Sequence, residues 1–574
     1  MGPHIFNKKK RPVMTDFSTK SFALLALSTF SLSACASLGI ETPKFVTKAL
    51  QGLATDAPTP APEAKTVFAS TKPIQTGDSY YRTGAAQLNA ALAQRATKGR
   101  AKNIILMIGD GMGMSTVTAG RIFSGQAKGL DGESYILEME KLPYTALSRT
   151  YAHDAQVSDS ASTVTALTTG AKTSIRTIGV DQSVPYGDCA ASKGHELTSL
   201  FELAEDAGRA TGVVSTARIT HATPSGVYGH VANRGWENDS VMDQKTKEAG
   251  CIDLARQLVE WPHGDGLEIA LGGGRANFLP KDVTDPEYED QTGARSDGRN
   301  LTEAWRANPD HHWIWNEQQF NAIDFDGPAK VLGTFEPSHM NFDGDRAKDG
   351  AGEPSLAAMT RAAITRLSQD KDGFVLMVEG GLIDMANHGN NAARALEDVM
   401  AFDAAVKTAR EMTDPAETLI IITADHSHGL TINGYPKRNN PILGLTNSLD
   451  GKPMKGADGK TYTTLLYSSG PGSMFATPDQ YRTIVPGKYS LSSDAKKDAA
   501  KRVSRPDPAL ADTLDHDYVQ QALIPSRYSM HTGEDVPVFA DGPSAWLVHG
   551  AIEENTLFHI MAYAGGLAGY SPDE

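Results

Sequence analysis

The chain has 574 residues and a formal net charge of −15, with 40% apolar and 21% charged residues. This composition is typical of a globular protein and does not favour disorder. The acidic balance argues against a nucleic-acid-binding role, which requires a basic surface. The length allows about three or four domains, but no clear break interrupts residues 78–570, so we expect a single folded domain there.

The N-terminus has the features of an export signal. Five basic residues precede an apolar run at 22–32 that is too short to span a bilayer comfortably. The run ends in Leu-Ser-Ala-Cys at 32–35, which resembles a bacterial lipobox. We therefore predict a signal peptide over 1–34, lipidation of Cys35, and an exported lipoprotein facing the periplasm or the cell surface. The alternative is an ordinary cleaved signal with an incidental cysteine.

Two segments connect this signal to the main part of the chain. Residues 35–77 are rich in Pro, Ala and Thr, which predicts a semi-extended tether. The stretch at 78–97 is amphipathic and opens on Asp78, a residue type that caps helices. We expect a helix here that packs against the domain or against a partner subunit.

Four segments share one plan, in which an apolar run is followed by side chains that can bind a metal. They are 103–109 before Asp110, 212–215 before His221 and Thr223, 374–378 before Glu379, and 419–424 before Asp425 and His426. Continuous apolar runs suit strands that are buried on both faces of a parallel sheet. Ligands gather at the carboxyl ends of such strands. The pattern predicts an α/β fold with a doubly wound, largely parallel sheet flanked by helices.

Ser160 lies at the start of a predicted helix, because a run of small residues at 161–167 follows it and Gly170 ends the pattern. A serine in this place faces free backbone N–H groups and the positive end of the helix dipole. Both favour an alkoxide and an incoming phosphate. Taken alone, an N-capping role for Asp159 or Ser160 is the better explanation. The metal-type residues elsewhere favour a serine that takes part in phosphoryl transfer.

The acidic and histidine residues fall into sets that suit metal ions. Asp384 and His388 are four residues apart, so a helix places both on one face. This pair suits Zn²⁺, with His531 as a third ligand. A second set of the same kind consists of Asp110, Asp425 and His426. Asp110 and Glu379 also offer oxygen ligands, which suit Mg²⁺. A single histidine of this kind is more often structural, but the repetition at several strand ends favours a metal cluster.

Other phosphate- and ester-binding motifs are weak or missing. The glycines at 109–113 lack the third glycine of a dinucleotide-binding loop, and no Walker A sequence follows any of the apolar runs. Ser160 is not in a G-x-S-x-G elbow, which counts against an α/β-hydrolase. Near the C-terminus, the polar stretch at 432–530 predicts a surface insertion. A final strand at 536–540 and a closing helix at 555–567 are expected after it.

From Asp78 to Leu567 the sequence resembles the alkaline phosphatases. The motifs that carry this resemblance are NIILMIGDGMG, VSDSAS with TGAKT, THATPSGVYGHVANR, VEGGLIDMANH, TADHSHG and HTGEDV. The middle of the chain, with EAGC, LGGGR, DPEYED and FEPSHM, is more similar to the animal-type enzymes than to the shorter enterobacterial ones. The resemblance implies that 78–570 is a catalytic domain and that 432–530 is its crown-like insertion.

The resemblance also implies a reaction and a set of roles. Small phosphomonoesters would be hydrolysed through a phosphoserine at Ser160, and Arg234 would clamp the phosphate. Two zinc ions and one magnesium ion would be bound. The first zinc would be held by Asp384, His388 and His531, the second, beside Ser160, by Asp110, Asp425 and His426, and magnesium by Asp110, Thr223 and Glu379, with His221 close by. The family is commonly dimeric, so we expect a homodimer or a lipid-anchored monomer.

Two further features follow from the compartment and the resemblance. An oxidising compartment favours a disulfide between Cys189 and Cys251 over two buried thiols, and the family has a matching disulfide. The resemblance also implies a calcium site where the animal enzymes bind that ion. Its ligands would be Glu287, the carbonyl of Phe335, Glu336 and Glu353.

The sequence departs from the family at two places near the site. Met385 stands where relatives usually carry a residue able to touch phosphate or its water, and a thioether donates no hydrogen bond. We therefore expect weaker binding of product phosphate. His221 replaces the acid of the enterobacterial enzymes, so the third site could hold zinc or magnesium. His428 either lines the substrate pocket or supports a metal-binding residue, and the sequence is consistent with both roles.

Three other functions are alternatives to a phosphomonoesterase. A phosphodiesterase of the same superfamily needs room beyond Arg234, which sequence does not show. A sulfatase is disfavoured because its nucleophile is a modified residue in another motif. A non-catalytic lipoprotein that binds phosphate or metal predicts a degraded site, whereas Ser160, Arg234 and all the zinc ligands are present.

Overall fold

The structure is a computed structural model that describes residues 74–473 and 505–571. The described residues divide into two units, with the boundary between residues 87 and 88. The predicted signal peptide at 1–34, Cys35 and the tether up to residue 73 lie outside the described residues. The expected helix over 78–97 is confirmed as α4 (Ser79–Ala93), and the Asp78 carboxylate accepts a hydrogen bond from the N–H of Tyr80. None of the α4 residues is buried.

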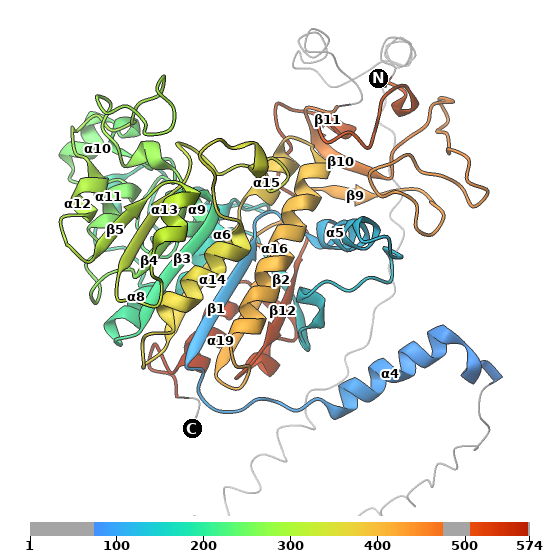
Figure 1. Cartoon of the computed structure of the whole chain (residues 1–574), viewed down its shortest axis with the longest axis horizontal. Helices are drawn as coiled ribbons and strands as arrows, with labels where there is room; N and C mark the ends of the chain where they lie inside the picture. The colour runs from blue at the N-terminus through green and yellow to red at the C-terminus, as the bar shows by residue number, and fades with distance from the viewer. Residues whose placement is uncertain (1–73, 474–504, 572–574) are drawn as a thin grey trace, which may run out of the picture. The chain divides into compact units, whose positions relative to one another are not determined.

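A ten-stranded sheet runs through the second unit, in the order β13-β2-β12-β8-β1-β7-β3-β4-β6-β5 (Figure 1). The seven strands from β8 to β5 are parallel, whereas β12 is antiparallel to both of its neighbours. The strands are β1 (Asn103–Gly109), β2 (Tyr144–Arg149), β3 (Ala210–Arg218), β4 (Ile269–Gly273), β5 (His311–Ile314), β6 (Lys330–Thr334), β7 (Phe374–Gly380), β8 (Thr418–Thr423), β12 (Val536–Asp541) and β13 (Gly550–Glu553).

The four predicted apolar runs are the four neighbouring strands β8, β1, β7 and β3. Strand β1 shows why they are apolar throughout. Ile104, Leu106 and Ile108 pack into the core on one face of the sheet, while Ile105 and Met107 pack into the core on the other. A strand that is buried on both faces exposes neither side to water, so its residues are apolar throughout.

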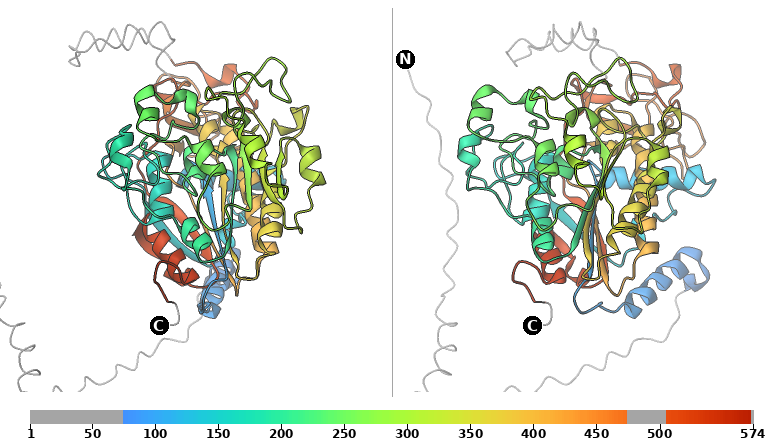
Figure 2. Two further views of the ribbon diagram at one scale, coloured as in Figure 1. Left: turned by 90° about the vertical axis from the view of Figure 1, so that its left-hand side faces the viewer. Right: turned by 60° about the vertical axis from the view of Figure 1, so that its left-hand side comes forward.

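Helices cover both faces of this sheet, as Figure 2 shows from its edge. Helices α14 and α16 contribute to one core, and α6, α8 and α19 to the other. The predicted doubly wound α/β class is therefore confirmed. The α-helices that follow α4 are α5 (Met114–Ala127), α6 (Ser160–Thr169), α7 (Cys189–Ser192), α8 (Leu200–Asp206), α9 (Ala222–Ser225), α10 (Gln244–Glu248), α11 (Leu254–Val259), α12 (Leu301–Trp305), α13 (Glu317–Ala322), α14 (Leu356–Leu367), α15 (Leu382–His388), α16 (Ala392–Met412) and α19 (Thr556–Gly565).

A separate three-stranded sheet lies between β8 and β12 in the sequence. It consists of β9 (Leu430–Ile432), β10 (Leu465–Gly470) and β11 (Ala522–Pro525), in the order β11-β10-β9. These strands fall within or at the border of the stretch predicted as an insertion, of which residues 474–504 lie outside the described residues. The strand expected at 536–540 is β12, and the closing helix is α19. Strand β12 is not the last strand, because the short, partly exposed β13 follows it.

Cys189 and Cys251 form a disulfide with a Cα–Cα distance of 6.0 Å. The predicted pairing is therefore present in the structure. Among the described residues, no helix combines the length and the apolar character needed to cross a membrane.

Candidate active site

The carboxyl ends of the central strands bring together the acids expected from the sequence. Ile108 of β1 is in register with Glu379 of β7 and with Thr423 of β8. Asp110, which follows β1, and Asp425, which follows β8, are therefore carried to the same edge as Glu379. Each of these three carboxylates belongs to a fully buried residue.

Helix α15 supplies the next two groups. Asp384 and His388 lie one turn apart, and the His388 Nε2 atom is 3.2 Å from Asp384 Oδ2. The loop at 528–531 is fastened to this helix, because the Ser529 N–H donates to the His388 carbonyl and the Ser529 carbonyl lies 2.6 Å from His388 Nδ1. The Nε2 atom of His531 is then 3.4 Å from that of His388. The set predicted for the first zinc ion is thus assembled.

His428 joins this first cluster, which consists of Asp384, His388, His428 and His531. Its Nε2 atom is 2.8 Å from Asp384 Oδ1, and the residue is fully buried. The sequence left open whether His428 lines the pocket or supports a metal ligand. The geometry favours the second role, in which His428 supports Asp384.

Two further clusters share Asp110. The second consists of Asp110, Asp384 and His426, and the third of Asp110, His221 and Glu379. Asp425 lies beside the second, with its Oδ2 atom 3.2 Å from His426 Nε2. The Thr223 hydroxyl donates to Asp110 Oδ2 over 3.4 Å, as expected for a group at the third site. The sequence missed that Asp384 belongs to two clusters and that the Ser215 hydroxyl donates to Glu379 Oε2.

Ser160 is the first residue of α6 and is almost fully buried among these groups. Its Oγ atom lies 3.5 Å from Asp110 Oδ2 and 3.2 Å from His426 Nε2. The N-cap is Asp159, whose side chain accepts from the Ser162 N–H. Capping is therefore performed by Asp159, and the Ser160 hydroxyl is left to face the clusters. The positive end of the α6 dipole lies at the same place.

The guanidinium of Arg234 is held beside Ser160 by two contacts. Nη1 donates to Asp159 Oδ2 over 2.8 Å, and Nη2 lies 3.0 Å from His221 Nε2. Burial lowers the pKa of Arg234, but Asp159 and the other carboxylates outweigh it and raise that pKa above its ordinary value. Arg234 is therefore a cation held in place next to an acidic site.

The buried acids lack the positive charge that would balance them. Burial, then the charge of Asp425, raises the pKa of Asp110 well above its usual value, and burial raises the pKa of Glu379 to about 7. Asp110 Oδ1 and Glu379 Oε1 are buried and have no hydrogen-bond partner. Such groups are costly unless they are paired or bind a metal. The donor set, with histidine nitrogens and carboxylate oxygens, fits divalent cations.

Met385 is half-buried, and its side chain packs against the core beneath α15. It follows Asp384 directly in the helix and offers no hydrogen-bond donor.

A fourth cluster lies away from Ser160 and contains Glu287, Glu336 and Asp349. Glu287 and Glu336 belong to the predicted calcium site, and Asp349 was missed. The predicted Phe335 carbonyl accepts from Nη1 of the buried Arg275 over 2.9 Å, and Nη2 of that arginine is 2.8 Å from Glu287 Oε2. A guanidinium therefore already occupies one side of this cluster.

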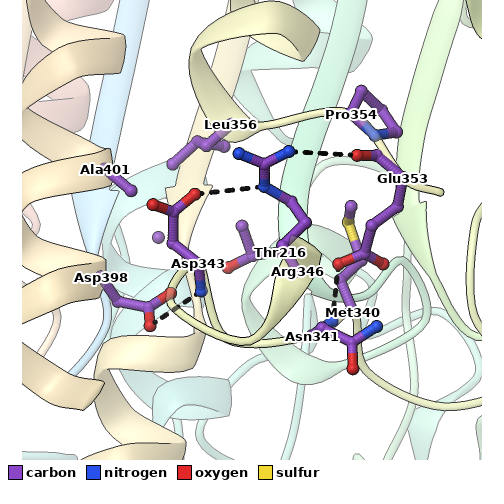
Figure 3. A pocket seen from close by; sticks show the side chains of 11 residues that line it. Thr216, Met340, Asn341, Asp343, Arg346, Glu353, Pro354, Leu356, Asp398 and Ala401 are labelled. Carbon is purple, nitrogen blue, oxygen red and sulfur yellow. Dashed lines mark hydrogen bonds and ion pairs between the residues drawn. The ribbon is translucent and has the colours of Figure 1, made fainter. Parts of the chain in front are cut away.

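Glu353, the last predicted calcium ligand, is not part of that cluster. Its Oε1 atom accepts from the Asn341 N–H, and its side chain lines a cavity of about 10 Å³ together with Asp343 and Asp398 (Figure 3). Arg346 bridges the cavity by donating to Asp343 Oδ1 and to the Glu353 carbonyl. The path of the loop at 343–353 places Asp349, and not Glu353, next to Glu287 and Glu336. The sequence pattern does not predict this path.

The chain is similar to known proteins over most of its length. A family model described as alkaline phosphatase matches residues 101–567. The tissue-nonspecific alkaline phosphatase isozyme of Gallus gallus is 41% identical over 484 residues, which cover 83% of this chain and 86% of that protein. The alkaline phosphatase of Gadus morhua is 39% identical over 487 residues, covering 83% of this chain and 94% of that protein.

Solved structures share the fold at lower sequence identity. The alkaline phosphatase of Thermus thermophilus has a TM-score of 0.56 at 23% identity and covers 84% of this chain and 96% of its own. That of the Antarctic bacterium TAB5 has a TM-score of 0.53 at 23% identity, covering 82% of this chain and 99% of its own. Together, the matching family model and the relatives near 40% identity mean that the chain is an enzyme of the alkaline phosphatase family.

Proposed function

We propose that this enzyme hydrolyses phosphomonoesters through a phosphoserine at Ser160 and releases inorganic phosphate. The observation that carries the proposal is the position of the Ser160 hydroxyl. It lies at a helix N-terminus, within 3.5 Å of Asp110 and 3.2 Å of His426, with Arg234 held nearby through Asp159. A nucleophile, a fixed cation and metal-type ligands are the parts that phosphoryl transfer requires.

The clusters support the binding of metal ions in this proposal. Zinc would be held by Asp384, His388 and His531, and by Asp110, Asp425 and His426, and magnesium or zinc by Asp110, His221, Thr223 and Glu379. Bound there, such ions lower the pKa of an attached hydroxyl or water and neutralise the charge of the transferring phosphoryl group. A mutant of the TAB5 enzyme is described with Mg bound in its M3 site.

The protein groups have separate tasks in the proposed reaction. The Ser160 hydroxyl gives up its proton and its oxygen forms a bond to phosphorus while the bond to the ester oxygen breaks, and the leaving alcohol takes up a proton. Arg234 binds two phosphate oxygens through its planar fork, as guanidinium groups do. Asp159 holds that fork in place. Water then attacks the phosphoserine, which restores the Ser160 hydroxyl and frees phosphate.

The direct test compares a chromogenic phosphomonoester with the matching diester. We expect the soluble domain, loaded with zinc and magnesium, to turn over the monoester much faster than the diester. Turnover of the diester alone would mean that the chain is a phosphodiesterase of the same superfamily. No turnover with metals bound would favour a protein that binds phosphate or metal without catalysis.

Met385 provides a prediction about product release. Replacing it by histidine adds a hydrogen-bond donor beside Asp384, and one such bond contributes about 1 kcal/mol. We expect Met385→His to lower the inhibition constant of inorganic phosphate about fivefold, and Met385→Leu to leave it unchanged. An unchanged constant in the histidine variant, with metal content intact, would contradict this role.

We also propose that the protein is exported and anchored to a membrane by a lipid on Cys35. The support is the lipobox-like sequence that follows the apolar run at 22–32. Cys35→Ser should move the protein from the membrane fraction to the soluble fraction, and Ser37→Ala should not. Membrane association that survives loss of Cys35 would refute the anchor. Sizing a version without residues 1–35 would distinguish a homodimer from a monomer.

A further inference from the structure

The two sides of the proposed reaction centre differ in exposure. Ser160 and His426 lie at the buried side, with exposed fractions of 1% and 0%. The side chains of His388 and His531 in the first cluster are 24% and 14% exposed. In-line displacement puts the leaving oxygen opposite the attacking one. The leaving group of a substrate therefore points away from Ser160 and emerges past His388 and His531.

Apolar side chains stand at that exit. Tyr528 is 56% exposed, and its ring lies perpendicular to that of His388 with a centroid distance of 5.5 Å. Met530, which precedes His531, is 44% exposed. Both are large hydrophobic side chains left facing solvent beside a polar site. An exposed apolar patch rimmed by polar residues is a mark of a binding surface.

The backbone fixes these two side chains in place. The residue between them, Ser529, is fully buried and makes both of its main-chain hydrogen bonds to His388. The Met530 N–H donates to Ser469 Oγ over 2.9 Å. Ser529 is thus anchored inside the protein, whereas Tyr528 and Met530 on either side of it are exposed to solvent.

We propose that Tyr528, with Met530 beside it, binds the leaving group of the substrate and favours phosphomonoesters whose leaving group carries a flat aromatic ring. Aryl phosphates and nucleoside monophosphates share this chemistry. An aromatic ring stacks or packs edge-on against tyrosine, and methionine sulfur makes favourable contacts with ring edges. The inference rests on the proposed function and names the substrates that this site prefers.

The test measures KM and kcat for three phosphomonoesters: 2-naphthyl phosphate, adenosine monophosphate and glycerol 2-phosphate. An aromatic pair is worth about 0.5–1.5 kcal/mol, so we expect Tyr528→Ala to raise KM for naphthyl phosphate about fivefold. Glycerol 2-phosphate should change less than twofold, as should the inhibition constant of inorganic phosphate. Tyr528→Phe, which keeps the ring, should behave like the unmodified enzyme. Adenosine monophosphate, whose leaving group also carries an aromatic ring, should show a rise of the same size.

Tyr435→Ala serves as the control, because Tyr435 is another exposed aromatic residue at 84% exposure. It should leave all three substrates unchanged. Equal losses for naphthyl and glycerol esters in Tyr528→Ala would mean that Tyr528 only maintains the site, and no loss for either would mean that it does not contact the substrate. Either result overturns the inference. Failure of the unmodified enzyme to hydrolyse any monoester would instead refute the proposed function.

Discussion

Replacing Ser160 by alanine should abolish covalent labelling of the protein by phosphate and reduce phosphomonoester turnover at least about a thousandfold. The reason is that the Ser160 hydroxyl is the only serine hydroxyl found within 3.5 Å of both Asp110 and His426 among the described residues. Its loss removes the group that would carry the phosphoryl group between the two half-reactions. The measurement is single-turnover labelling with radioactive phosphomonoester, followed by denaturation and counting.

Metal content distinguishes loss of the nucleophile from loss of the site. Ser160→Ala should retain nearly all of its zinc and magnesium, because the three clusters are built from other side chains. Ser162→Ala is a suitable control, since Ser162 lies in the same first turn of α6 but hydrogen-bonds to Asp159. Labelling that persists in Ser160→Ala would show that another group is the nucleophile.

The second large effect concerns Asp384, an acid that belongs to two clusters. Asp384→Asn keeps the shape of the side chain but removes its negative charge. We expect it to lower bound zinc and to reduce turnover at least about 100-fold, because loss even of groups behind a metal ligand costs 10–100-fold. Elemental analysis of the purified variant, together with steady-state kinetics, measures both changes.

An exposed acid provides the comparison for Asp384. Asp290→Asn removes one charge from the surface, where a single carboxylate contributes little, and should leave metal content and turnover unchanged. Asp384→Asn with full zinc content and full activity would mean that this cluster does not hold a catalytic metal.

The central part of the fold was predictable because its strands are buried on both faces. The apolar runs ending near Asp110, Glu379 and Asp425 identify neighbouring parallel strands, and such strands carry their ends to one edge. The spacing of Asp384 and His388 likewise placed both on one side of α15. These inferences depend on local periodicity, which a single sequence displays directly.

Contacts between distant segments were less visible. Ser215 meets Glu379 because β3 and β7 pair in one register, and the sequence does not encode that register in any local pattern. Strand β13 was missed because it is short and partly exposed, with no apolar run. The acid near Glu287 and Glu336 is Asp349, since the loop at 343–353 follows a path that spacing alone does not predict.

The most direct test of the central claim is phosphomonoester hydrolysis by the soluble enzyme before and after removal of its metals. We predict that chelation abolishes hydrolysis and that added zinc restores it, with magnesium increasing the recovered rate. The zinc needed should approach two ions per chain, matching the sets around Asp384 and Asp110. Hydrolysis that continues undiminished in a protein shown to be free of zinc would contradict the account.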